Sequence, residues 1–143
     1  MRSKAPLVMM EQMVMLLVFA LAAALCLQAF VKSDQLSQQG EVRDRAVTLC
    51  QNAAEAIRAT GGDFSQAAKG LEATQHDKDS LMIDYTQDWT PAEDTMRYTL
   101  GVSRVDSGLP GLGKATVWMR DEAGETELFR LEVSWQEEVQ QRG

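Results

Sequence analysis

The stretch Met13–Val31, MVMLLVFALAAALCLQAFV, decides the fold of this chain. Gln28 is its only strongly polar residue. As a helix it would span roughly 28 Å at about 1.5 Å per residue, close to the hydrocarbon thickness of a bilayer. Helix-compatible sequence continues to about Thr60. The sequence therefore predicts a short basic segment over 1–12, a transmembrane helix over 13–31 and a soluble continuation of that helix over 32–61.

The residues around this run argue against its removal as a signal. The small residues Ala22–Ala24 lie in the middle of the run, whereas a secretory signal is cleaved at small residues that follow its apolar region. Leu25 precedes Cys26, where a lipoprotein signal needs a small residue. We therefore expect a single-pass membrane anchor.

Basic residues on the two sides of the run bear on its orientation. Arg2 and Lys4 precede it, and Lys32, Arg43 and Arg45 follow it. Positive charge favours the cytoplasmic side, and here the two sides are nearly balanced. The compact basic tip favours a cytoplasmic N-terminus, with the C-terminal domain outside the plasma membrane.

An amphipathic pattern follows the membrane run. Apolar or small residues recur at helical spacing, and charged residues occupy the opposite face. Gly61 and Gly62 then end the predicted helix, and Asp63 is placed to cap a second short helix within a segment, 62–79, that also contains a linker. The apolar positions of the long helix are Val42, Ala46, Leu49, Cys50, Ala53 and Ile57.

From Ser80 the hydrophobic period changes to that of strands. Four segments alternate apolar and polar residues, which is typical of a small antiparallel sheet with one buried face. We expect this sheet over 80–136, packed on the apolar stripe of the long helix, with a polar tail over 137–143. The segments are Leu81–Thr86, Met96–Ser103, Ala115–Arg120 and Phe129–Trp135.

The charge of the chain excludes one class of partner. The chain has 143 residues and a formal net charge of −7, and its acidic and basic residues are interspersed. Nucleic-acid binding requires a basic surface that displaces counterions from phosphates. We expect no nucleic-acid partner.

The order of these elements resembles that of the type IV pilin and pseudopilin superfamily. The local resemblance lies in Lys4–Glu11, KAPLVMME, which is similar to the leader junction of that family. There a glycine, or sometimes an alanine, precedes the cleavage point, and a glutamate is the fifth mature residue. Cleavage between Pro6 and Leu7 would place Glu11 at that position. This chain departs from the pattern by having Pro6 in place of glycine and Leu7 in place of the usual phenylalanine.

The resemblance implies an α+β fold in which a long N-terminal helix, membrane-spanning in its first half, packs on a small four-stranded antiparallel sheet, as in the lollipop shape of pilins. It also implies a structural component of a type IV pilus or of a type II secretion-type assembly. Its partners would be membrane lipid and other pilin-like subunits or assembly proteins. Glu11 would register neighbouring subunits by pairing with an N-terminal amine. The alternative is a non-assembling, membrane-anchored extracytoplasmic interaction domain.

Candidate catalytic and ligand-binding patterns carry little weight in this sequence. Gly108–Lys114 matches the glycine and lysine spacing of a phosphate-binding loop, but Ala115 follows where a Ser or Thr is needed, so a hairpin connection is favoured. His76 is the only histidine, and the cysteines Cys26 and Cys50 would lie about 36 Å apart on one helix. A zinc site would therefore lack ligands. We expect no enzyme activity, no cofactor, no metal and no small-molecule substrate.

Two further groups of residues are open to more than one interpretation. The acidic groups at Asp84/Asp88/Glu93/Asp94 and Asp121/Glu122/Glu125 lack the ligand spacing of a calcium loop, so solvated turns are favoured over calcium sites. Trp135 continues an apolar strand face and is expected in the core. Trp118 lies on the opposite face, where it either marks a subunit contact or packs under a neighbouring arginine or the tail.

Overall fold

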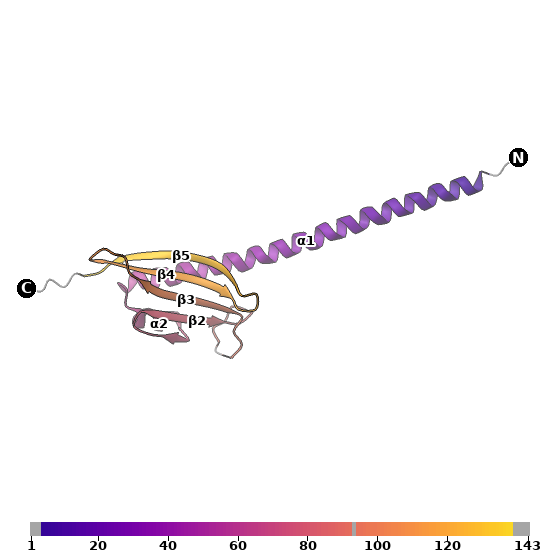
Figure 1. Cartoon of the computed structure of the whole chain (residues 1–143). Coiled ribbons are helices and arrows are strands. Elements are labelled where there is room, and N and C mark those ends of the chain that lie inside the picture. Colours follow the sequence, from indigo (N-terminus) through magenta and orange to yellow (C-terminus); the bar gives the residue numbers. More distant parts are fainter. Residues whose placement is uncertain (1–3, 93, 139–143) are drawn as a thin grey trace, which may run out of the picture. The chain divides into compact units, whose positions relative to one another are not determined.

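The computed structural model describes residues 4–92 and 94–138. It contains two helices and five strands, and the chain divides into two compact units between Glu41 and Val42. Figure 1 shows the elements in their order along the chain. Their bounds are α1 Ala5–Ala59, α2 Phe64–Leu71, β1 Gln75–His76, β2 Ser80–Tyr85, β3 Tyr98–Val105, β4 Leu112–Asp121 and β5 Thr126–Gln136.

The predicted α+β fold is confirmed, with one correction to the strand count. The sheet has five antiparallel strands in the order β1-β2-β3-β4-β5, whereas the sequence predicts four. The additional strand, β1, has only two residues, so it leaves no alternating pattern in the sequence. His76 therefore lies in an edge strand and not in a linker.

The long helix begins earlier than the membrane run. α1 starts at Ala5, so residues 5–12 belong to it, and it continues without interruption through Gly40. It ends at Ala59; Gly61 and Gly62, which follow, both adopt positive φ angles, and the Gly62 amide donates to the carbonyl of Ile57. This is the glycine cap that the sequence predicts.

The core of the second unit lies between the amphipathic part of α1 and one face of the sheet. Ala46, Cys50, Ala53 and Ile57 are fully buried, as the helical spacing predicts. Leu81, Ile83, Leu100, Val102, Ala115, Val117, Met119, Val133 and Trp135 are the apolar sheet residues buried against them. Alternation therefore correctly predicts the buried face.

The short helix α2 completes this core. The Asp63 carboxylate accepts a hydrogen bond from the Gln66 amide at 3.1 Å, which confirms the predicted N-cap. Phe64, Ala67 and Ala68 are buried on its inner side.

The prediction that a strand begins at Met96 is wrong. β3 begins two residues later, at Tyr98, and the Met96 side chain is exposed.

Candidate functional site

The most distinctive surface of the molecule belongs to the first half of α1. This segment is long and apolar enough to cross a membrane, and none of it is buried within the chain. Its large apolar side chains point outward on every side of the helix, from Leu7 to Leu36. Water solvates such a surface poorly, so the segment is suited to apolar surroundings such as lipid.

The residues of the predicted processing junction lie at the start of this helix. Pro6 is the second residue of α1, where a proline is tolerated because the first helical amides have no partner within the helix. Leu7 and Glu11 are exposed on the first turns. In the part of the chain that the structure describes, no hydrogen bond or ion pair engages the Glu11 carboxylate.

The two thiols lie in different environments. Cys26 is exposed on the apolar half of α1, and Cys50 is buried in the core beneath the sheet. Burial raises the pKa of the Cys50 thiol to about 12. A protonated, enclosed thiol of this kind is a packing group and not a nucleophile.

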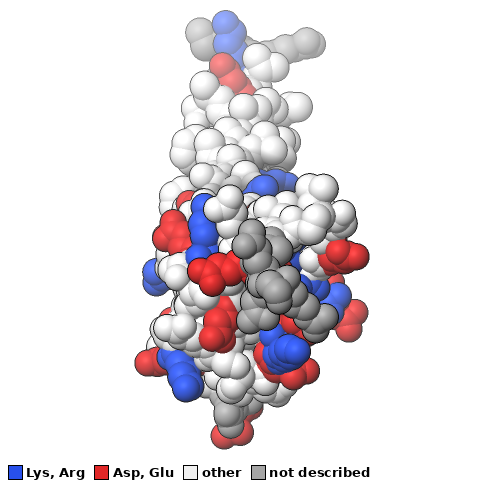
Figure 2. All heavy atoms as spheres, turned by 90° about the vertical axis from the view of Figure 1, so that its left-hand side faces the viewer, with Lys and Arg blue, Asp and Glu red and all other residues white. Residues whose placement is uncertain are grey.

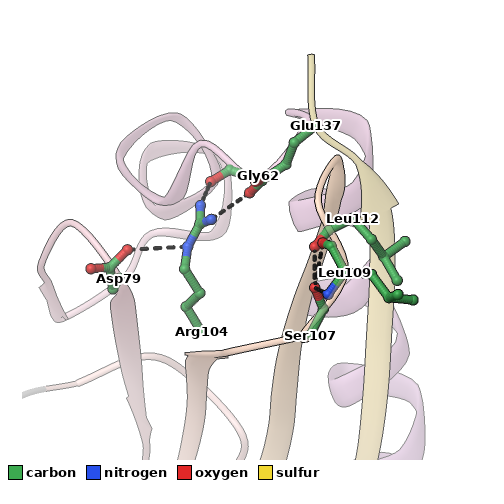
Figure 3. Close-up of polar contacts among 7 residues, drawn as sticks. All are labelled: Gly62, Asp79, Arg104, Ser107, Leu109, Leu112 and Glu137. Atoms are coloured by element: carbon green, nitrogen blue, oxygen red, sulfur yellow. Dashed lines mark hydrogen bonds and ion pairs between the residues drawn. The ribbon is translucent and has the colours of Figure 1, made fainter. Parts of the chain in front are cut away.

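Sequence reasoning missed Arg104, which makes polar contacts with three other segments of the chain (Figure 3). Its Nε lies 3.1 Å from Oδ1 of Asp79, its Nη2 donates to the carbonyl oxygen of Gly62 at 3.1 Å, and its Nη1 donates to Glu137. Its guanidinium also lies 5.6 Å from the Phe64 ring centroid and 5.4 Å from that of Trp135. Arg104 thus joins the end of β3 to the α1–α2 turn, to the β1–β2 connection and to the residue after β5.

A signal for this cluster exists in the sequence. Arg104 follows Tyr98, Leu100 and Val102 at period two, so the strand alternation assigns it to the core face. At the end of this face the Arg104 side chain is partly exposed, and its guanidinium reaches carboxylates at the rim of the core. The partners themselves come from distant segments and are not recognisable in the sequence.

Two open depressions flank Arg104. One, of about 670 Å³, is lined mainly by residues 62–65 and 76–79, and the other, of about 410 Å³, by the β3–β4 turn and Glu137. Ser65, His76 and Asp79 line the first depression together, but no hydrogen bond joins their side chains to one another within the described ranges. The contacts of Arg104 therefore hold separate segments together. Ser65, His76 and Asp79 do not form a nucleophile activated by a base.

The glycine-rich segment Gly108–Lys114 is a hairpin connection, as favoured from the sequence. Gly108 and Gly111 adopt positive φ angles, and the Ser107 hydroxyl contacts the carbonyl oxygens of Leu109 and Leu112 (Figure 3). Lys114 lies in β4, where it pairs with Glu132 at 2.9 Å. The lysine is thus engaged on the sheet and is not followed by a helix that could bind phosphate.

Two residues of the acidic groups, Asp84 and Asp121, have protein partners. Asp84 is buried and accepts a hydrogen bond of 2.9 Å from the Thr99 hydroxyl. Asp121 pairs with Arg97 at 3.1 Å and caps the turn that follows it. Glu93 lies outside the described residues. In the described ranges no group of three or more acidic, histidine or cysteine side chains is arranged to hold a metal ion.

The three tryptophans have three different surroundings. Trp135 is buried, as expected, and Trp118 is half-buried on the open sheet face, over Gly101 and opposite Arg130. Trp89 has a positive φ of 63° and stacks on Tyr98, with ring centroids 4.0 Å apart and planes 2° apart. Trp89 thus closes one end of the core.

Charge is distributed evenly over the visible surface of the second unit. Figure 2 shows acidic and basic side chains interspersed, without a large patch of either sign.

Comparisons with protein-family models, with curated proteins and with solved structures found no match to this chain.

Proposed function

We propose that the protein is a single-pass membrane component that assembles in the manner of a pilin or pseudopilin, in a type IV pilus or a type II secretion-type machine. The observation that carries this proposal is the division of one continuous helix, α1, into two halves. Its first half exposes apolar side chains all around, and one face of its second half, from Ala46 to Ile57, is buried in the core. One half therefore remains available to lipid and to neighbouring helices while the other holds the extracytoplasmic domain.

Glu11 supports assembly over simple anchoring. It lies at the border of the apolar segment with no partner in the described part of the chain, and a carboxylate at the edge of a membrane is stabilised by pairing with a cation. In the proposed assembly that cation is the N-terminal amine of the next subunit, freed by cleavage between Pro6 and Leu7. The N-terminal side faces the cytoplasm, and the protein works by contact and not by turnover.

Processing provides the first test. The intact mass of the protein extracted from its own membranes should correspond to a chain that begins at Leu7. A chain that still carries Met1 would contradict the proposal and favour the alternative, a permanently anchored extracytoplasmic domain that binds a partner without assembling.

Registration provides the second test. Formaldehyde cross-linking in intact membranes should trap multimers of the wild type and far fewer of Glu11→Gln. The matched control is Glu41→Gln, an exposed glutamate on the same helix beyond the apolar run. Equal cross-linking of the two variants would exclude Glu11 from registration.

A further inference from the structure

We infer that the open face of the sheet, around Trp118, is a binding site for a neutral saccharide. Strand pairing places Trp118 between Gly101 of β3 and Arg130 of β5, and Met82 of β2 continues the same row beyond Gly101. Side chains alternate between the two faces of a strand, so this row lies on the face opposite the core. The inference concerns the second unit alone and goes beyond the assembly proposed above.

The indole of Trp118 rests on the backbone of β3. A Cβ atom placed on Gly101 would lie only 2.2 Å from Cζ2 of Trp118, so the ring occupies the space that a side chain would need. Trp118 is half-buried, and within the described ranges no second aromatic ring or guanidinium stacks on it. The side of the ring turned away from Gly101 is therefore available for a ligand.

A row of oxygen-bearing side chains runs beside this ring. Ser80 pairs with Ser103, Ser103 with Thr116, and Thr116 with Glu132, so the row crosses four strands. It lies about 7 Å from the row of Trp118, because residues two apart on a strand share a face. In the part of the chain that the structure describes, none of the three hydroxyls hydrogen-bonds to another residue. Each can therefore donate to and accept from a ligand.

The apolar surface beside these hydroxyls extends from Trp118 to Met82. The Met82 side chain is 36% exposed and lies two strands away, a span of about 10 Å. A sugar ring has two kinds of surface that match this arrangement. Its C–H groups carry partial positive charge and contact the negative face of an aromatic ring, while its hydroxyl groups exchange hydrogen bonds at the edge.

The charges on this face balance one another. The Lys114 ammonium pairs with Glu132 at 2.9 Å, and the Arg130 guanidinium pairs with Glu127 at 2.7 Å. Three cations and three carboxylates belong to the described strand residues of the face, which favours an uncharged ligand over an acidic or a basic one. They are Lys114, Arg120 and Arg130, and Asp84, Glu127 and Glu132.

A peptide or a second copy of the chain fits this face less well. Proline-rich peptides bind in grooves lined by several aromatic rings, whereas Trp118 is the only aromatic residue among the described strand residues of this face. A stable interface between two copies needs a broad apolar centre. Near Trp118 the exposed apolar surface is the narrow strip that ends at Met82. A small ligand rich in hydroxyl groups matches such a strip.

Saturation-transfer NMR of the full chain in lipid nanodiscs tests the inference. The probes are four neutral sugars: cellotetraose, chitotetraose, maltotetraose and mannotetraose. At least one should bind, and the C–H protons of one ring face should receive most of the transfer. Trp118→Leu should weaken its binding about fivefold or more, because it removes the stacking surface, and Trp118→Phe should retain part of the affinity.

A second arm leaves the indole intact. Ser103→Ala should weaken binding about threefold, because it removes one hydroxyl of the row. Ser134→Ala is the matched control: it is an exposed serine on the same face, opposite Lys114 and two rows from Trp118, and should bind like the wild type.

Three outcomes would overturn the inference. The first is that no tetrasaccharide binds the wild type more tightly than it binds Trp118→Leu. The second is that Ser103→Ala binds like the wild type or that Ser134→Ala weakens binding as much. The third is that decaproline binding or self-association of the chain depends on Trp118 while no tetrasaccharide binds, which would assign the face to a peptide or to a second copy.

Discussion

The indole of Trp135 lies across Gly113, its direct partner in the β4–β5 ladder. A Cβ atom placed on Gly113 would lie only 2.2 Å from Cε2 of Trp135. The ring also covers Gly62, where a Cβ atom would lie 2.3 Å from Nε1. Two glycines that are distant in the sequence thus make room for one buried side chain.

Gly113→Ala should lower the free energy of unfolding by about 1–3 kcal/mol, because the added methyl group overpacks this contact. Such a loss corresponds to a decrease in melting temperature of about 4–8 °C per kcal/mol. Tryptophan fluorescence of the full chain in detergent is the measurement, since all three tryptophans lie within residues 89–135. Gly70→Ala is the control: nothing lies within 4 Å of its Cβ position, so stability should not fall.

Arg104→Ala should destabilise the second unit by about 1 kcal/mol, because it removes partly exposed ion pairs and the contact of the guanidinium with the rings of Phe64 and Trp135. Arg104→Lys should recover only part of this loss, since an ammonium cannot donate in the directions of the guanidinium fork. Urea unfolding followed by fluorescence measures both variants. Arg130→Ala, which removes an exposed pair, should leave the midpoint unchanged; a shift as large as that of Arg104→Ala would refute a special role for the cluster.

Thr99→Val should cost about 1–3 kcal/mol, because the buried Asp84 carboxylate loses the hydroxyl that donates to it at 2.9 Å. Thr99→Ser keeps the hydroxyl and should retain most of the stability. Thr116→Val is the matched control on the same, open sheet face, where the side chain is half-buried. The melting temperatures of the three variants decide the prediction, and equal effects of both valine substitutions would contradict it.

Stability should decrease at alkaline pH through two buried acids. Burial raises the pKa of Cys50 from 9.0 to about 12, and burial followed by the charge of Cys50 raises the pKa of Tyr85 from 10.0 to about 12. Both groups favour the folded state while they are neutral, so their contribution is fully present below pH 9 and is lost as the pH rises towards 12.

Urea unfolding between about pH 8 and pH 11 tests this dependence. Cys50→Ala should be less stable at pH 8 because of the cavity, yet its stability should fall less steeply with pH. An unchanged slope in this variant would show that the thiol does not contribute.

The exposed Glu127 should titrate below its usual range. The hydrogen bonds from Arg130, and then its charge, lower the pKa of this carboxyl. Arg130→Gln should therefore raise the pKa of Glu127, as measured by NMR of its side-chain carboxyl carbon.

Local patterns in the sequence predict most of the fold. Helical spacing from Val42 to Ile57 identifies the buried stripe of α1, and alternation identifies the buried face of four strands, because residues three and four apart share a helix face and residues two apart share a strand face. The cap at Asp63 and the glycine stop at Gly61 and Gly62 are local for the same reason.

The sequence by itself thus determined the apolar half of α1, the amphipathic half that follows, and the sheet. Only the tertiary structure decided which distant residues meet: Arg104 with Asp79 and Glu137, and Trp135 with Gly62 and Gly113. The physical reason is that secondary structure follows from residues a few positions apart, whereas these contacts depend on the register and the order of strands far apart in the chain.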